Sequence, residues 1–272
     1  MSRSVTPKQW NINGPALELT KLLGLHPDPT LLLERLESAA QVTVVIPVYN
    51  GGDSVARCLK SVKAHTANAR ILVIDDGSTD PDVVATLDSY ARRGDVELVR
   101  HPENLGYTRT VNQALRLAES DDVVLLNSDT KVGPMWLNRM RWVAYSEYEV
   151  ATVTAVSDNA GAMSVPIPGK ENLWPAHLTW DEVARGVMQT APEWKSTVPT
   201  GHGFCMYIRR YAIDKIGGFD EEAFPMGYGE ENDFCQRAIG AGFSNLLAPH
   251  VIVHHDRSQS FGEDRKKPLV EA

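Results

Sequence analysis

The chain has 272 residues, 43% hydrophobic and 23% charged, which is typical of a globular protein large enough to enclose a small-molecule site. Its formal net charge of −8 argues against a nucleic-acid-binding protein, which needs a basic face. No run reaches the roughly 20 apolar residues that span a bilayer, and the first ten residues are polar, unlike a signal peptide. Cys58, Cys205 and Cys235 lack metal-type spacing, so we expect buried thiols in a cytoplasmic protein.

The predicted elements begin with an N-terminal helical extension over residues 1–40. Its leucines suggest short helices on either side of a break at His26–Pro29, where two prolines interrupt the pattern. Next come β-branched apolar runs, which predict strands buried on both faces. These runs lie at residues 42–48, 70–75, 96–99 and 122–126.

Helices are predicted between these strands. Apolar residues recur at helical spacing in 53–66 and 108–118, and Asp80 followed by Pro81 is a typical helix start. Such alternation predicts a mostly parallel sheet with helices on both faces, and ligands bind such sheets beyond the carboxyl ends of the strands. The loops at those ends are 47–53, 75–80, 101–107 and 127–131.

The second half of the chain has weaker patterns. Residues 157–200 are rich in proline and tryptophan without clear periodicity, so we expect a long substrate-side loop region. A charged tail, residues 263–272, is expected to be flexible. Strands are expected at 204–208, 245–248 and 251–254, and helices at 210–216 and 230–241.

Polar residues gather at the predicted binding edge. Each segment alone is also typical of a turn or a helix cap, but their joint position at one sheet edge predicts a ligand site. The segments are Pro47–Gly51, Asp75–Asp80, Asn104–Arg109 and Asn127–Thr130.

This part of the chain resembles the nucleotide-binding half of family 2 glycosyltransferases of the GT-A fold, at residues 42–51, 75–80, 104–106 and 126–130. Residues 203–210, 217–220 and 227–237 resemble the family's acceptor-side motifs, with a pattern similar to rhamnosyltransferase-like enzymes of bacterial polysaccharide synthesis. The resemblance covers residues 42–262. It implies an α/β GT-A domain at 41–262, with a Rossmann-like, mostly parallel sheet, whose nucleotide-binding half is 41–130 and whose acceptor half is 131–262.

The activity that the resemblance implies is inverting, metal-dependent sugar transfer from a UDP- or dTDP-sugar to a hydroxyl. The acceptor would be a glycan or a lipid-linked saccharide, and the enzyme would act in the cytoplasm or at the inner face of the membrane. Asp76 would accept a hydrogen bond from the uracil or thymine imide, and Tyr49 would pack against the base. Arg109 and Asn112, one helical turn apart, would reach the nucleotide, although Arg109 is equally typical of a solvated helix arginine. The full nucleotide-binding set is Pro47, Tyr49, Asn50, Asp76, Asn104, Gly106, Arg109, Asn112, Asn127 and Ser128.

Asp129 is the residue that the resemblance implies as the ligand of a divalent cation, Mn²⁺ or Mg²⁺. The family's usual signature is Asp-any-Asp, and here Asn127 holds the first position, which leaves metal affinity and metal choice open. His254 corresponds best to a further ligand in the family, with His255 as the second candidate. Neighbouring side chains on a strand point to opposite faces, so only one of the two is expected to bind the metal.

The general base that the resemblance implies is Glu231, with Glu230 as the alternative. Both open a predicted helix, where the positive end of the helix dipole keeps a carboxylate ionised. Asp233 and Arg237 are spaced for an ion pair along the same helix. Further candidates for sugar contacts are Ser157–Asn159, Trp174, Trp180, Trp194 and His202.

Other functions are less consistent with these patterns. A dinucleotide-dependent oxidoreductase needs Gly-x-Gly-x-x-Gly after the first strand, where Asn50-Gly-Gly-Asp-Ser stands instead. A nucleotidyltransferase would need a glycine-rich basic loop that residues 50–57 do not supply. The remaining alternative is a non-catalytic sugar-nucleotide or glycan-binding module with a degraded metal site, which Asn127 favours.

Overall fold

A nine-stranded sheet forms the centre of the protein in a computed structural model that describes residues 28–191 and 194–256. The strand order is β3-β2-β1-β4-β8-β6-β9-β5, and β7 also pairs with β9. The strands are β1 (Val42–Val48), β2 (Arg70–Asp75), β3 (Glu97–Arg100), β4 (Asp122–Leu126), β5 (Thr130–Lys131), β6 (Val150–Ser157), β7 (Ser196–Val198), β8 (Cys205–Ile208) and β9 (Ser244–His255).

Strand direction determines which loops meet. β1 is parallel to β2 and β4, β2 is parallel to β3, and β6 is parallel to β9. β8 is antiparallel to both of its neighbours, β4 and β6. The carboxyl ends of the parallel strands therefore share one edge with the amino end of β8, which brings residues 200–204 there. The predicted α/β architecture with a mostly parallel sheet is confirmed.

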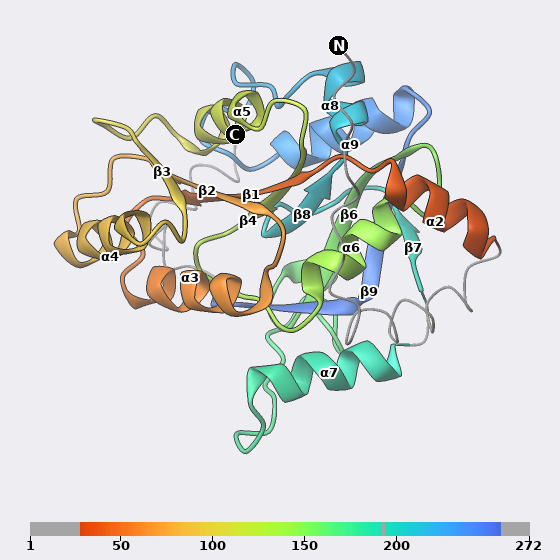
Figure 1. Ribbon diagram of the computed structural model, residues 1–272, viewed down its shortest axis with the longest axis horizontal. Coiled ribbons are helices and arrows are strands. Elements are labelled where there is room, and N and C mark those ends of the chain that lie inside the picture. Colours follow the sequence, from red (N-terminus) through yellow and green to blue (C-terminus); the bar gives the residue numbers. More distant parts are fainter. Residues whose placement is uncertain (1–27, 192–193, 257–272) are drawn as a thin grey trace, which may run out of the picture.

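Helices cover both faces of the sheet, as predicted (Figure 1). Alternation along β1 divides the core: Val44 and Ile46 pack with one group of helices, and Val45 packs with the other. On the first face lie α2 (Pro29–Glu37), α3 (Asp53–His65), α4 (Pro81–Arg92) and α6 (Trp136–Ala144). On the second lie α5 (Tyr107–Leu117), α8 (Arg210–Ile216) and α9 (Glu230–Gly240).

The region predicted as a long loop, 157–200, contains regular structure. It holds α7 (Trp180–Thr190) and β7, and α6 and β6 precede it without having been predicted. The start of α7 is a capping box, in which Thr179 and Glu182 each bond the other's backbone N–H. That pattern of a threonine followed three residues later by a glutamate was a usable local signal.

The structure also bears on the predictions for the last strands, the cysteines, membrane spans and the terminal segments. The strands predicted at 245–248 and 251–254 are one strand, β9, whose pairing with β6 shifts between Ala248 and Ile252, around Pro249. Cys58, Cys205 and Cys235 are free and buried. Within the described ranges, no helix has the length and apolar character needed to cross a membrane. The first predicted N-terminal helix and the predicted flexible tail lie outside the described residues.

Candidate functional site

A cleft of about 750 Å³ opens at the shared strand edge, where the sequence predicts the ligand site. Loops after β1, β2 and β4 form one part of its wall, and residues 200–204 and 226–232 form another. Most of the predicted site residues line it: Pro47, Tyr49, Asp76, Asn104, Gly106, Asn127, Ser128, Asp129, Glu230 and Glu231.

Asp76 fixes the loop that follows β3 while it lines the cleft. One carboxylate oxygen accepts the N–H of Leu105 at 2.9 Å, and the other accepts the N–H of Gly106 at 3.0 Å. His101 bonds the first oxygen at 2.7 Å and contacts Gln113 through its other ring nitrogen. At Gly106 the backbone has φ +93°, and a Cβ would lie 2.6 Å from the carbonyl oxygen of Pro225, so only glycine fits.

Asn50 positions loops and does not line the cleft, which corrects its predicted nucleotide contact. Its side-chain oxygen accepts the N–H groups of Thr79 and Asp80 at 2.8 and 2.9 Å, and its own N–H donates to Ser78. These bonds join the loop after β1 to the loop after β2. Asn50 itself adopts the left-handed conformation, φ +53°, which asparagine tolerates better than most residues.

Arg109 and Asn112 also lie away from the cleft, which corrects the predicted contacts of both. The Arg109 side chain is 56% exposed and faces Glu221 at 4.0 Å. Asn112 is buried, and its amide bonds the N–H and the carbonyl of Phe219 and the carboxylate of Glu221. The helical spacing was right, but this face of α5 holds the 219–221 segment instead of a ligand.

Asp129 and His255 lie together in the cleft as two potential metal ligands, which we call the metal-type pair. Nε2 of His255 lies 3.2 Å from a carboxylate oxygen of Asp129, and both side chains are more than nine-tenths buried. The Phe204 ring stacks on His255, with centroids 5.4 Å apart, and holds its plane. Asn127 lies beside them, with its amide nitrogen 3.5 Å from His255 Nε2. Two adjacent oxygen and nitrogen donors suit Mn²⁺, which accepts both ligand types.

His254 faces away from Asp129, which corrects its predicted role as the metal ligand. Its ring nitrogens contact Asp158 and Asp256, the latter at 2.9 Å. The hydrogen bond to Asp158 raises the pKa of His254, and both ring nitrogens are occupied by contacts with carboxylates other than Asp129. Alternation along β9 places the two histidines on opposite sides, and the sequence could not tell which side faces Asp129.

Glu230 and Glu231 enter the cleft from the first turn of α9. Glu231 accepts the N–H of Gly203 at 3.0 Å, from the segment that precedes β8. Glu230 is 2% exposed, and one of its oxygens has no hydrogen-bond partner among the described residues. Burial, together with the charge of Glu231, raises the pKa of Glu230 to about 8. The neutral, protonated form of Glu230 is therefore favoured near neutral pH.

Tyr107 is a residue that the sequence did not single out. It lines the cleft at the start of α5, and burial with the nearby glutamates holds the pKa of its hydroxyl well above the usual value. It is therefore a neutral hydrogen-bond donor beside Glu231. Because α5 and α9 are far apart in the sequence, the contact between them could not be predicted. Only the Asn104–Arg109 segment indicated that this region belongs to the site.

Other residues outside the predicted set also line the cleft. They include Thr110, Thr200, Phe204, Met226 and Tyr228. His202, a candidate for sugar contacts, lines the cleft as well.

Comparisons with known proteins find relatives in sequence and in fold. Residues 43–217 match the family described as Glycosyl transferase family 2. The chain is 31% identical to the Pre-mycofactocin glycosyltransferase of Mycobacterium tuberculosis, over 80% of this chain and 43% of that protein. It is 27% identical to the N-acetylglucosaminyl-diphospho-decaprenol L-rhamnosyltransferase of the same organism, over 84% of this chain and 81% of that protein.

Solved structures share the fold. The crystal structure of GalNAc-T7 with UDP, GalNAc and Mn²⁺ superposes with a TM-score of 0.63 at 18% identity, over 80% of this chain and 44% of that one. At this identity the likeness concerns the fold. The chain spans less than half the length of that protein and of the first relative.

Proposed function

Because the chain belongs to glycosyl transferase family 2, we propose that it moves a sugar from a nucleotide-sugar donor to a hydroxyl with inversion at the anomeric carbon. The observation that carries this proposal is one cleft lined both by a metal-type pair, Asp129 and His255, and by an acidic pair, Glu230 and Glu231. The domain that does this would be residues 41–262, with its donor half at 41–130 and its acceptor half at 131–262.

The donor's nucleoside would bind between Tyr49 and Asp76. Asp76 Oδ2 accepts one bond, from Gly106, and a carboxylate oxygen can accept a second, which an imide N–H of uracil or thymine would supply. UDP- and dTDP-sugars are therefore the proposed donors. The UDP in the GalNAc-T7 structure supports this choice.

A divalent cation, Mn²⁺ or Mg²⁺, would be held by Asp129 and His255 beside the diphosphate. Within the described residues no cluster of three or more His, Cys, Asp or Glu side chains could hold a metal, so diphosphate oxygens and water would complete the coordination. When bound, the cation supplies Lewis acidity to the departing diphosphate. Asn127 contributes an amide in place of a second carboxylate.

Glu231 would act as the general base. Its carboxylate takes the proton of the acceptor hydroxyl while that oxygen bonds to the anomeric carbon, whose bond to the diphosphate oxygen breaks on the opposite side. Gly203 holds Glu231 by its N–H, and the raised pKa of Glu230 favours a neutral carboxyl beside it. The acceptor is proposed to be a hydroxyl of a glycan or of a lipid-linked saccharide.

The test is transfer, or slow hydrolysis when no acceptor is supplied, with a panel of UDP-, dTDP-, GDP- and CMP-sugars and Mn²⁺. We expect turnover of a UDP- or dTDP-sugar, an inverted anomeric configuration by NMR, and loss of turnover in Glu231→Gln. A retained configuration, or full activity in Glu231→Gln, would contradict the mechanism. Nucleotide-sugar binding without any turnover would favour the non-catalytic module that Asn127 suggests.

A further inference from the structure

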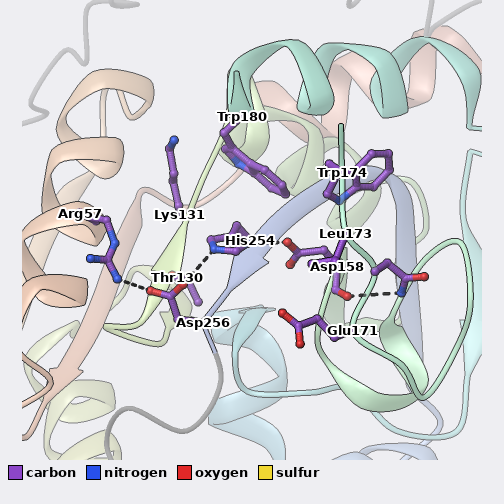
Figure 2. Close-up of a pocket in the computed structure, with 11 residues that line it drawn as sticks. Arg57, Thr130, Lys131, Asp158, Glu171, Leu173, Trp174, Trp180, His254 and Asp256 are labelled. Carbon is purple, nitrogen blue, oxygen red and sulfur yellow. Dashed lines mark hydrogen bonds and ion pairs between the residues drawn. The ribbon is translucent and has the colours of Figure 1, made fainter. Parts of the chain in front are cut away.

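A second pocket, of about 320 Å³, lies on the side of β9 that carries His254 (Figure 2). Its wall includes the ribbon of β5 and β9, in which Lys131 pairs with His254 and Thr130 pairs with His255. His254 lines this pocket while His255 lines the large cleft. A molecule in the second pocket is thus separate from the donor, and we propose that the pocket binds a neutral saccharide unit.

Two tryptophans form an aromatic wall of the pocket. Trp180 comes from the start of α7 and Trp174 from the loop before it, and Figure 2 shows both rings on the same side of the pocket. Trp180 packs against the His254 ring with centroids 5.3 Å apart, which fixes its orientation. Flat aromatic rings with apolar faces are suited to the C–H faces of a sugar ring.

Hydrogen-bonding groups of both kinds surround this wall. The Lys131 ammonium and the Glu171 carboxylate line the pocket, and neither has a hydrogen bond or ion pair with another of the described residues. Lys131 only donates and Glu171 only accepts, whereas a sugar hydroxyl does both. The hydroxyls of a polyhydroxylated ligand can therefore bond with a group of either kind.

The charges of the pocket favour a neutral ligand. Asp158, Glu171 and Asp256 face Arg57 and Lys131, with His254 between Asp158 and Asp256. An anion would meet the carboxylates and a cation would meet the guanidinium and ammonium groups, so neither sign is favoured. The volume is at the small end of the range of about 300 to 1,000 Å³ that is typical of small-molecule pockets.

The loop that carries Trp174 is held in place before any ligand binds. The buried Asn172 side chain donates to the carbonyls of Asp158, Ile167 and Lys170 and accepts the N–H of Ile167. Such preorganisation reduces the entropy lost on binding. Leu173, which follows, is 87% exposed where it lines the pocket, and so offers apolar surface to a ligand.

The test is saturation-transfer NMR of neutral sugars with the full chain, in the presence of UDP and diamagnetic Mg²⁺ so that the donor cleft is filled. The panel contains glucose, galactose, mannose, rhamnose, N-acetylglucosamine and their disaccharides. We expect at least one neutral sugar to bind, and Lys131→Met and Glu171→Gln each to weaken it about tenfold, since each removes a bond to a charged group. A disaccharide that binds more tightly than its monosaccharides would identify a glycan as the occupant, and equal binding would identify a single sugar.

Ring variants make the test specific. Trp180→Ala should abolish the signal, and Trp180→Phe, which keeps a ring and protects against misfolding, should retain it. Tyr148→Ala removes an exposed aromatic ring outside both pockets and should change nothing. The proposal is overturned if no neutral sugar binds, or if binding is the same in Lys131→Met, Glu171→Gln and Trp180→Ala. The UDP affinity of each variant, measured in the same samples, shows separately whether the donor cleft is intact.

Discussion

Two neighbouring histidines of β9 provide a matched pair of substitutions at the scale of single residues. His255 lies 3.2 Å from Asp129, while both ring nitrogens of His254 contact carboxylates on the other side of the strand. We expect His255→Ala to weaken Mn²⁺-dependent UDP binding at least tenfold. His254→Gln, which can still donate to a carboxylate, should leave that affinity within twofold. Isothermal titration compares the two, and the reverse order of effects would show that the ligand is His254.

Glu230 gives the protein a defined pH dependence. Its pKa is raised from 4.5 to about 8 in the folded state by burial and the charge of Glu231, so between these values the folded protein holds a proton that the unfolded chain has released. The free energy of unfolding attributable to this group therefore falls as pH rises from 4.5 to 8. In Glu230→Gln, the free energy of unfolding should fall less steeply over this pH range. Denaturation curves recorded at several pH values give that free energy. An unchanged slope in Glu230→Gln would mean that Glu230 is not the group responsible.

Substitution of Glu231 should lower the rate of the chemical step and leave the affinity for the donor unchanged. A general base contributes about 10²- to 10⁴-fold to a rate, so Glu231→Gln should lower kcat by at least about 100-fold while UDP affinity with Mn²⁺ is unchanged. The measurement is kcat from the transfer assay beside a UDP titration. A large loss of UDP affinity with an unchanged kcat would assign Glu231 to the donor site.

At the scale of elements, antiparallel β8 brings Gly203 against the first turn of α9. A Cβ at Gly203 would lie 2.5 Å from a carboxylate oxygen of Glu231, at the flexible end of that side chain. Gly203→Ala should therefore displace Glu231 and lower kcat about tenfold or more, with little change in Tm. The tenfold estimate follows from the sensitivity of catalysis to small misplacements of a reacting group.

A second glycine provides the control for that substitution. Gly186, inside α7, would place a Cβ where no atom lies within 4 Å. Gly186→Ala should raise the free energy of unfolding by about 0.5 to 1 kcal/mol, because alanine loses less entropy in a helix, and should leave kcat unchanged. Equal effects of the two substitutions on kcat would mean that contact with Glu231 is not the cause in Gly203→Ala.

Local patterns explain which elements could be predicted. The apolar runs of β1, β2 and β4 and the spacing in α3 and α5 are strong local signals, and their strand ends led to Asp76 and Asp129. α6, β6 and α7 were missed although each has a local signal. Trp136, Leu137 and Met140 begin a helical spacing in α6, and residues 150–156 are a β-branched run. Thr179 and Glu182 mark the start of α7. The side of β9 on which each histidine lies, and the partners of Asn112, depend on packing between distant segments, which the sequence does not display.

At the scale of the whole molecule, the net charge of −8 leads us to expect that binding of a diphosphate depends on a cation. Among the residues that the structure describes, the lining of the cleft includes Asp76, Asp129 and the two glutamates but no lysine or arginine. Ligands that bind the native state raise its melting temperature by mass action. We expect UDP to raise Tm with Mn²⁺ present and to have little effect after the metal is removed with EDTA.

The most direct test of the account is a calorimetric titration of UDP into the wild-type chain and into Asp129→Ala, each with Mn²⁺ and with EDTA. The account predicts binding by the wild type only when Mn²⁺ is present, and at least a tenfold weaker affinity in Asp129→Ala under the same conditions. Circular dichroism of Asp129→Ala should match that of the wild type. UDP binding of equal strength with EDTA, or in Asp129→Ala, would contradict the central claim that Asp129 and a cation together hold the diphosphate.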